Sequence, residues 1–185
     1  MAKNKIAQQN INLLDKIKYI LSNPNYFFEQ VKNEYGIKNS LITYISVSLF
    51  SVVVAISIDF TMSRNVSYFW LFYAIVVVLS FVFSFAYAGI MHLLAISLKG
   101  SGTYSDAYRA YAYSMLPFLV LLLIPFVGSI SIIYSLILMI IGISKLYSLS
   151  KGNSAIVVLV PIIFILGLIV LTIIYLFWGV RRSSF

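Results

Sequence analysis

The chain has 185 residues, of which 62% are hydrophobic and 10% charged, with a formal net charge of +8 and no cysteine. Soluble domains average about 45–50% apolar and about 25% charged residues. This composition therefore excludes a water-soluble fold and predicts an all-α membrane protein. The absence of cysteine excludes disulfides, thiolate metal sites and thiol nucleophiles. The positive charges flank apolar segments, as topology signals do, so we do not expect nucleic-acid binding.

Residues 1–38 are predicted to form an amphipathic cytoplasmic segment. They lack the unbroken apolar stretch of about 7–15 residues that marks a signal peptide. Apolar residues recur at helical spacing between residues 5 and 21, which predicts a surface helix that ends at Pro24. A second short amphipathic stretch follows at residues 26–35. These helices either cover the membrane domain or bind a partner, and Pro24, Phe27 and Phe28 are candidates to face that partner.

Residues 39–185 are predicted to form a membrane domain of five spanning helices. The first, residues 41–58, is uncharged and reaches roughly 27 Å, just enough for a hydrocarbon core of about 30 Å. The second, residues 68–98, is longer than a span requires, which predicts tilt, a kink or protrusion beyond the bilayer. The remaining spans are predicted at residues 111–127, 129–146 and 155–178.

The polar loop before the third span contains Gly100 and Gly102, which we expect to end one helix. Ser105 and Asp106 are expected to begin the next as N-cap and first-turn anion. Asp106 and Arg109 lie at the edge of this predicted span, where water reaches them. We count both among the residues that face a cytoplasmic partner.

The distribution of lysine and arginine predicts the orientation. With a cytoplasmic N-terminus, ten of these residues lie inside and three outside, and the opposite orientation reverses the ratio. The inside set comprises Lys3, Lys5, Lys16, Lys18, Lys32, Lys38, Lys99, Arg109, Lys145 and Lys151, and the outside set comprises Arg64, Arg181 and Arg182. We therefore predict a cytoplasmic N-terminus and an external C-terminus, with the last two arginines as a local exception.

Ionisable residues inside spans are functional candidates by default, and His92 is the one clearly inside a predicted span. We favour a packed histidine bonded to a neighbouring hydroxyl or carbonyl, with a proton or ligand role as the alternative. An enzyme is not expected, because one histidine cannot form an HExxH motif and no GxSxG serine elbow is present. No metal or cofactor site is predicted. Small residues at helix-contact spacing, namely Ser80, Ser84 and Ala88, predict close helix packing instead.

The segment "YRAYAYSMLPFLVLLLIPFVG", residues 108–128, places tyrosines ahead of an apolar run that holds two prolines. One interpretation is an interfacial belt in which Tyr104, Tyr108 and Tyr111 bury their rings and keep their hydroxyls wet. The other is a kink at Tyr113, Ser114 and Pro117, because proline removes a backbone donor and frees the carbonyl of Tyr113. Both interpretations can hold together.

Two stretches resemble the Ypt-interacting protein (Yip) domain family. "AYAYSMLP" at residues 110–117, preceded by "LKGSGTYSDAYRA", is similar to its tyrosine-serine-proline motif, carried here by Tyr111, Tyr113, Ser114 and Pro117. "ILSNPNYFFEQV" at residues 20–31 looks like the segment that introduces the domain. The resemblance covers roughly residues 15–178.

Membership would imply a five-helix bundle with a cytoplasmic N-terminus. In eukaryotic members it also implies binding of Rab/Ypt GTPases and a role in vesicle traffic or membrane shaping. Those proteins carry a longer N-terminal region than residues 1–38, so we do not expect GTPase recognition here. The short form is more like bacterial and archaeal members, which would place a prokaryotic protein in the cell membrane.

Two functions remain open from the sequence. The first is a non-catalytic scaffold or adaptor that recruits a cytoplasmic protein partner to the lipid bilayer. The second is a small transporter or lipid-handling, scramblase-like protein, with Pro117 and His92 shaping a path. Homo- or hetero-oligomers are compatible with either function.

Overall fold

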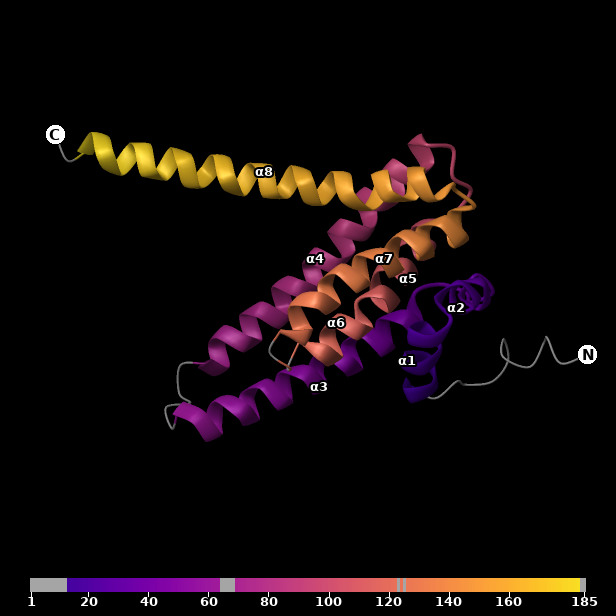
Figure 1. Ribbon diagram of the computed structural model, residues 1–185, viewed down its shortest axis with the longest axis horizontal. Helices are drawn as coiled ribbons and strands as arrows, with labels where there is room; N and C mark the ends of the chain where they lie inside the picture. The colour runs from indigo at the N-terminus through magenta and orange to yellow at the C-terminus, as the bar shows by residue number, and fades with distance from the viewer. Residues whose placement is uncertain (1–12, 64–68, 123, 125, 184–185) are drawn as a thin grey trace, which may run out of the picture.

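The computed structural model describes residues 13–63, 69–122, 124 and 126–183. All regular secondary structure in these ranges is helical (Figure 1). The helices in chain order are α1 (Leu13–Ser22), α2 (Pro24–Val31), α3 (Lys38–Ser63), α4 (Phe69–Ser97), α5 (Tyr104–Ser114), α6 (Leu116–Leu121), α7 (Val127–Tyr147) and α8 (Lys151–Ser183).

Within the described ranges, four helices are long and apolar enough to cross a membrane, rather than the five predicted. The apolar stretches are Lys38–Ile58 in α3, Leu71–Ser97 in α4, Val127–Tyr147 in α7 and Lys151–Leu176 in α8. They correspond to the first, second, fourth and fifth predicted spans. The chain is therefore an all-helical protein with membrane-spanning helices.

The third predicted span, residues 111–127, is not one continuous helix. α5 ends at Ser114 and α6 starts at Leu116, so Pro117 occupies the first turn of α6. A proline is tolerated there because the first amides of a helix have no intrahelical partner. α5 has 11 residues and α6 has 6, and neither alone can span a bilayer that requires about 20.

α5 and α6 together follow α7 in the antiparallel direction. At one end, the Tyr147 hydroxyl donates to the carbonyl of Thr103 over 2.6 Å. In the middle, α5 and α7 pack closely at Ala110 and Gly142. At the far end, a Cβ on Gly128 would lie 3.0 Å from the Cα of Leu122. The broken pair α5–α6 therefore accompanies the whole length of α7.

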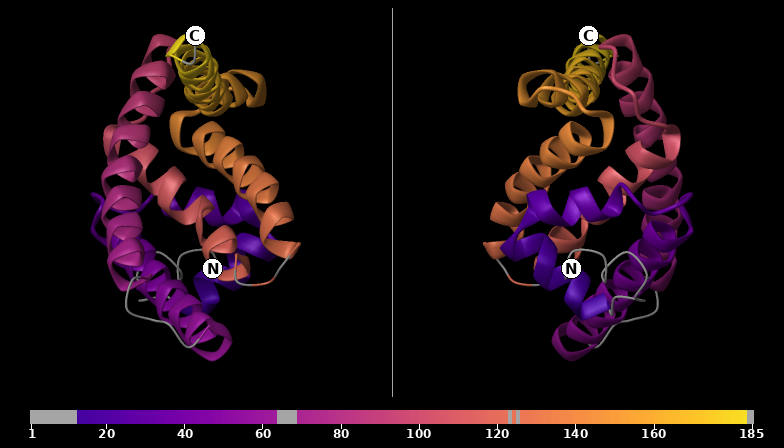
Figure 2. Two further views of the ribbon diagram at one scale, coloured as in Figure 1. Left: turned by 90° about the vertical axis from the view of Figure 1, so that its left-hand side faces the viewer. Right: turned by 90° about the vertical axis from the view of Figure 1, so that its right-hand side faces the viewer.

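α1 and α2 form a helical hairpin against the bundle, as Figure 2 shows. Asn23 caps α2, since its side chain accepts the Tyr26 amide over 3.2 Å, and Pro24 takes the first helical position. The buried side chains of the hairpin are Ile20, Phe27, Phe28 and Val31. The two amphipathic helices thus cover the membrane domain. The part of the predicted first helix before Leu13 lies outside the described residues.

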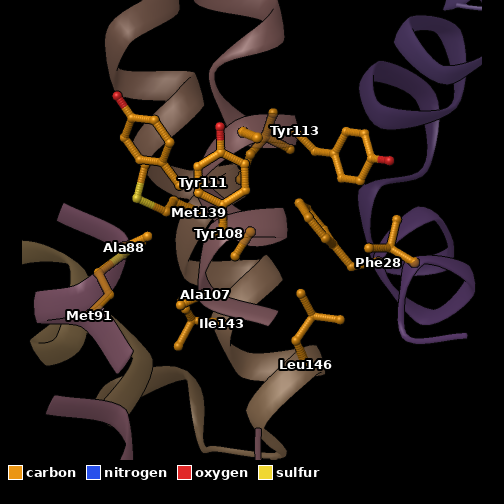
Figure 3. Close-up of a cluster of buried hydrophobic side chains, with 14 of the residues drawn as sticks. Phe28, Ala88, Met91, Ala107, Tyr108, Tyr111, Tyr113, Met139, Ile143 and Leu146 are labelled. Atoms are coloured by element: carbon orange, nitrogen blue, oxygen red, sulfur yellow. The ribbon is translucent and has the colours of Figure 1, made fainter. Parts of the chain in front are cut away.

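The buried core occupies one part of the bundle only (Figure 3). In α4, no described side chain is buried before Ser84, and in α8 none is buried after Pro161. The C-terminal half of α8 extends away from the other helices (Figure 1). Of the three small residues predicted to pack closely, Ser84 and Ala88 are fully buried in α4, whereas Ser80 is half-buried. The remaining helix surfaces are apolar and exposed, as expected for contact with lipid.

The glycines of the loop after α4 have a different role from the predicted one. The residue in the left-handed region is Lys99, with φ of 64°, whereas neither glycine has a positive φ. A Cβ on Gly100 would lie 2.8 Å from the carbonyl oxygen of Ala95, and one on Gly102 would lie 2.8 Å from the Tyr147 ring. Both glycines are therefore needed for close approach rather than for a turn.

Candidate functional site

The centre of the candidate site is a buried ion pair on α5. Arg109 Nη2 lies 2.6 Å from Asp106 Oδ1. The exposed fraction of the side chain is 5% for Arg109 and 12% for Asp106. The other carboxylate oxygen accepts the backbone amide and the hydroxyl of Thr103, each over 2.7 Å. Thr103, not Ser105, is therefore the N-cap of α5, and Asp106 is its first-turn anion. This corrects the predicted cap by two residues.

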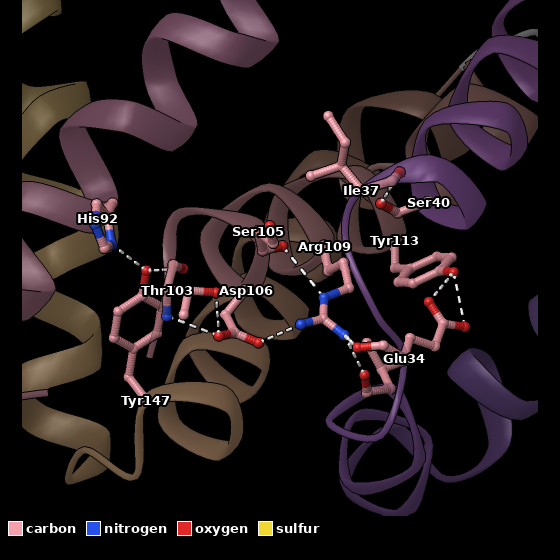
Figure 4. Close-up of polar contacts among 11 residues, drawn as sticks. Glu34, Ile37, Ser40, His92, Thr103, Ser105, Asp106, Arg109, Tyr113 and Tyr147 are labelled. Atoms are coloured by element: carbon pink, nitrogen blue, oxygen red, sulfur yellow. Dashed lines mark hydrogen bonds and ion pairs between the residues drawn. The ribbon is translucent and has the colours of Figure 1, made fainter. Parts of the chain in front are cut away.

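Arg109 also joins α5 to the end of α2 (Figure 4). Its Nη1 donates to the carbonyl of Val31 over 2.8 Å and to the carbonyl of Glu34. Its Nε donates to the carbonyl of Ser105 over 3.2 Å. A buried charge is costly unless it is paired and hydrogen-bonded, and here the guanidinium is both. The side chain that helps to anchor α5 thus also caps the C-terminal end of α2.

A second cluster surrounds Tyr113, one turn further along α5. Its hydroxyl donates to the Glu34 carboxylate, 2.8 Å from Oε2 (Figure 4). Lys16 of α1 approaches the same group, with Nζ 3.2 Å from the Tyr113 oxygen and 3.8 Å from Glu34 Oε1. The ring of Tyr113 packs edge-on against Phe27, with centroids 5.2 Å apart. Tyr113 therefore links α1, α2 and the loop that follows α2.

His92 takes part in a third set of contacts, at the end of α4. Its Nδ1 lies 2.7 Å from the Tyr147 hydroxyl, which in turn lies 2.6 Å from the carbonyl of Thr103. Because a carbonyl can only accept, the tyrosine proton goes to Thr103, and His92 must donate from Nδ1. This is the kind of contact that the packed-histidine interpretation predicts. A proton or ligand role for His92 stays a prediction.

The predicted tyrosine belt is wrong for Tyr108 and Tyr111. Both side chains are buried in the core rather than placed at a wet interface. Tyr108 stacks on Phe85 of α4 with centroids 4.7 Å apart, and Tyr111 lies 5.6 Å from Tyr87. The Tyr108 hydroxyl has no hydrogen-bond partner among the described residues. The error arose because helical spacing identifies a shared face but does not say whether lipid, water or protein covers it.

The predicted kink is present as a break between α5 and α6. Tyr113, Ser114 and Pro117 are all buried there. The Ser114 hydroxyl has no partner in the part of the chain that the structure describes, so it does not satisfy the carbonyl that proline frees. α3 contacts the helix that follows the break, because the Ser51 hydroxyl lies 2.7 Å from the carbonyl of Leu119 in α6.

The residues predicted to face a partner are mostly inside the protein. Phe27, Phe28, Asp106 and Arg109 are buried, and Pro24 is half-buried. An amphipathic pattern marks an apolar face correctly, but here the chain's own bundle covers that face. In this conformation only Pro24 retains substantial exposure for contact with another molecule.

Sequence reasoning missed Glu34, Tyr147 and Gly142. Each contributes through a contact with a distant segment, such as Glu34 with Tyr113 or Tyr147 with Thr103. Gly142 contributes by its small size, since a Cβ there would lie 2.9 Å from the ring of Phe28. Glu34 is one of five acidic residues in the whole chain, and this scarcity is the signal that could have pointed to it.

The exposed charges of this end form one further pair. Lys145 Nζ lies 2.7 Å from Glu29 Oε1, and the hydrogen bond and charge of that lysine lower the pKa of the Glu29 carboxyl. Lys32 Nζ lies 3.3 Å from the Ser148 hydroxyl in the turn between α7 and α8. Within the described ranges, no three His, Asp or Glu side chains gather closely enough to hold a metal ion.

One of three comparisons with known proteins gave a match. A search of curated proteins and a search of solved structures gave no match. The sequence profile of the Yip1 domain matches residues 18–174, which include α2 to α7, half of α1 and most of α8. Because this match covers most of the 185 residues, the chain belongs to the Yip1 domain family of membrane proteins.

Proposed function

We propose that the protein is a non-catalytic membrane scaffold or adaptor that recruits a protein partner to its cytoplasmic end. The observation that carries this proposal is that the buried charged side chains are all engaged in hydrogen bonds and an ion pair. Asp106 and Arg109 bond to each other and to the backbone of three segments. Side chains bonded in this way stabilise the shape of a surface, and neither of the two is free to react or to bind a substrate.

The proposed topology has five passages, one of which is the broken pair α5–α6. The end of α4 and the end of α7 meet, because the Ser101 amide donates to the carbonyl of Tyr147 over 3.1 Å. The chain must therefore return to the opposite end between α4 and α7, and α5–α6 make that return. Lysine-rich loops then favour a cytoplasmic N-terminus and an external C-terminus.

This topology is testable because the chain has no cysteine. A single cysteine is introduced at Ala2 or at Ser184, and intact cells or spheroplasts are treated with a membrane-impermeant maleimide. Labelling of the C-terminal cysteine alone supports five passages with the N-terminus inside. Labelling of both or of neither would overturn the odd number of passages.

The recruitment surface is tested by photo-crosslinking at exposed positions. A photoreactive amino acid replaces Leu14, which is 73% exposed on α1, or Lys99 in the loop after α4. The matched control position is Leu171, exposed on the C-terminal half of α8. We expect protein adducts from the first two positions and lipid adducts from the control. Lipid adducts from all three positions would count against a scaffold.

A truncation of residues 1–30 would not separate partner binding from folding, because it would remove Phe27 and Phe28 from the core. The alternative function, transport or lipid handling, is tested by a liposome assay of flux and lipid scrambling. The assay compares wild type with His92→Ala and Pro117→Ala. Activity that these substitutions abolish would favour the alternative. In the described residues His92 is bonded to Tyr147, which supports a packing role.

A further inference from the structure

The loop between α2 and α3, residues 32–37, is hydrogen-bonded at both of its ends. The Asn33 amide donates to the carbonyl of Gln30 and the Glu34 amide to the carbonyl of Val31, each over 3.0 Å. At the other end of the loop, the Ser40 hydroxyl donates to the carbonyl of Ile37 over 2.9 Å. Both ends of the loop are therefore hydrogen-bonded to the neighbouring helices.

Two side chains of α5 bind the same loop from inside the bundle. The buried Arg109 guanidinium binds the carbonyls of Val31 and Glu34, and the Tyr113 hydroxyl binds the Glu34 side chain (Figure 4). Arg109 is itself fixed by Asp106. A fork-shaped guanidinium with several bonds has little freedom left to move. The loop is thus fastened to the least exposed helix of the protein.

The apex of this fastened loop is Tyr35, whose side chain is 95% exposed. It has the highest exposure among the large hydrophobic side chains that the structure describes. Gly36, with φ of 64°, turns the chain directly after it. Lys32 and Lys38 are exposed on either side, while the loop's acidic side chain, Glu34, points inward to Tyr113. The loop therefore exposes an aromatic side chain with Lys32 three residues before it and Lys38 three residues after it. Lys32 Nζ also lies 3.3 Å from the Ser148 hydroxyl.

We propose that Tyr35, Lys32 and Lys38 form a docking surface for an acidic segment of a protein partner. Tyrosine is among the residues enriched at the energetic centres of protein interfaces. Lysines beside it select a negatively charged surface and speed the encounter. A preformed loop also lowers the entropic cost of binding one defined shape. A fluid layer of lipid headgroups has no defined shape and gains nothing from that rigidity.

This inference rests on the proposed scaffold function and names the class of its partner. In the test, a photoreactive benzoylphenylalanine replaces Tyr35 in the full-length protein in its native membrane, and the adducts are identified by mass spectrometry. We expect a protein adduct whose crosslinked peptide is rich in Asp and Glu. The yield of this protein adduct should fall at least about fivefold when Lys32→Glu and Lys38→Glu are combined. The matched control Lys151→Glu, exposed in another segment, should keep the yield.

The proposal would be overturned by lipid adducts alone, by no adduct, or by a yield that charge reversal does not change. Protein adducts at Leu14 or Lys99 without any at residue 35 would leave the scaffold function standing and remove only this surface. An absence of protein adducts at all three positions would remove both.

Arg109 acts here as a positioning residue, and its role has a separate readout. A nitroxide label on Tyr35→Cys reports the mobility of the loop by electron paramagnetic resonance. We expect Arg109→Lys, which keeps the charge but loses the fork, to sharpen the spectrum and to lower the crosslinking yield. Tyr87→Phe serves as a control that weakens the fold away from the loop, because it removes the bond of 2.7 Å from α4 to the carbonyl of Val158 in α8, and it should leave both readouts unchanged. Equal effects of the two substitutions, or none from Arg109→Lys, would overturn the positioning role.

Discussion

The ring of Phe28 in α2 packs directly on Gly142 in α7. A Cβ at position 142 would lie 2.9 Å from Cε1 and 3.0 Å from Cζ of that ring, and 3.2 Å from the Cβ of Ala110. Phe28 is fully buried, and Ala110 belongs to α5. A single glycine therefore lets α2, α5 and α7 meet at one point.

We predict that Gly142→Ala destabilises the protein by about 1–3 kcal/mol, the usual cost of overpacking a core. The added methyl must displace either the Phe28 ring or α5. Thermal or denaturant unfolding in detergent, followed by circular dichroism, measures the change. Gly167→Ala is the matched control, because nothing lies within 4 Å of a Cβ at that position in α8. A similar loss from both substitutions would show that packing on Phe28 is not the cause.

Asp106→Asn is expected to destabilise the fold by about 3 kcal/mol or more, because it leaves the buried Arg109 charge without its ion-pair partner. The same unfolding assay measures the effect. Glu29→Gln also removes a carboxylate from an ion pair, but that pair with Lys145 is exposed. Exposed pairs contribute little, so this control should unfold close to wild type. The prediction fails if the two variants lose the same stability.

The Glu29–Lys145 pair predicts a specific dependence on pH. Lys145 lowers the pKa of the Glu29 carboxyl in the folded state, so the unfolded chain binds its proton first as pH falls. The pair therefore stabilises the fold above the unfolded pKa of about 4.3 and loses this contribution as pH falls through the lower folded value. Because the pair is exposed, unfolding midpoints of wild type and Glu29→Gln should differ only slightly near neutral pH, and this small difference should disappear in acid. A constant difference across that range would contradict the assignment.

Tyr113→Phe removes the hydroxyl that binds Glu34 and leaves the ring in place. Hydrogen bonds to charged groups contribute roughly 1.5–3 kcal/mol, so we expect a loss of that size in the unfolding assay. Tyr175→Phe on the exposed half of α8 removes the same atom and should have no effect. An unchanged Tyr113→Phe variant would mean that Glu34 is held by other groups.

The tautomer of His92 follows from its contacts with Tyr147. Since the tyrosine proton goes to the carbonyl of Thr103, the neutral imidazole should carry its hydrogen on Nδ1. Nitrogen-15 NMR of labelled histidine at alkaline pH distinguishes the two ring nitrogens, and His92 is the chain's sole histidine. In Tyr147→Phe the acceptor is gone, so the Nε2-protonated form should become populated. A wild-type spectrum dominated by that form would contradict the hydrogen-bond direction.

Much of the fold follows from the pattern of apolar residues. The lengths of the uncharged stretches located α3, α4, α7 and α8 within a few residues, because a helix must satisfy its backbone in lipid over about 20 residues. Asn23 and Pro24 marked the turn between α1 and α2, and Pro117 marked the break after α5. These features depend on local chemistry, which neighbouring residues in the chain determine.

The candidate site could not be predicted in the same way. The sequence placed Phe28, Asp106 and Arg109 on the surface, whereas the structure buries all three. A polar or amphipathic pattern states what a side chain prefers to contact but not which segment supplies that contact. Arg109 becomes stable inside the protein because Val31 and Glu34, more than seventy positions earlier, offer it their carbonyls.

The sequence by itself determined that this is a helical membrane protein, where most of its helices lie and that it resembles the Yip family. Only the tertiary structure decided that the tyrosines of α5 form a core and that the loop around Tyr35 is bonded to α5. It also decided that, within the described part of the chain, four rather than five helices are long enough to span a membrane. The physical reason is the range of the interactions. Burial in lipid and backbone hydrogen bonding act on each helix separately, whereas packing and ion pairing depend on which helices meet.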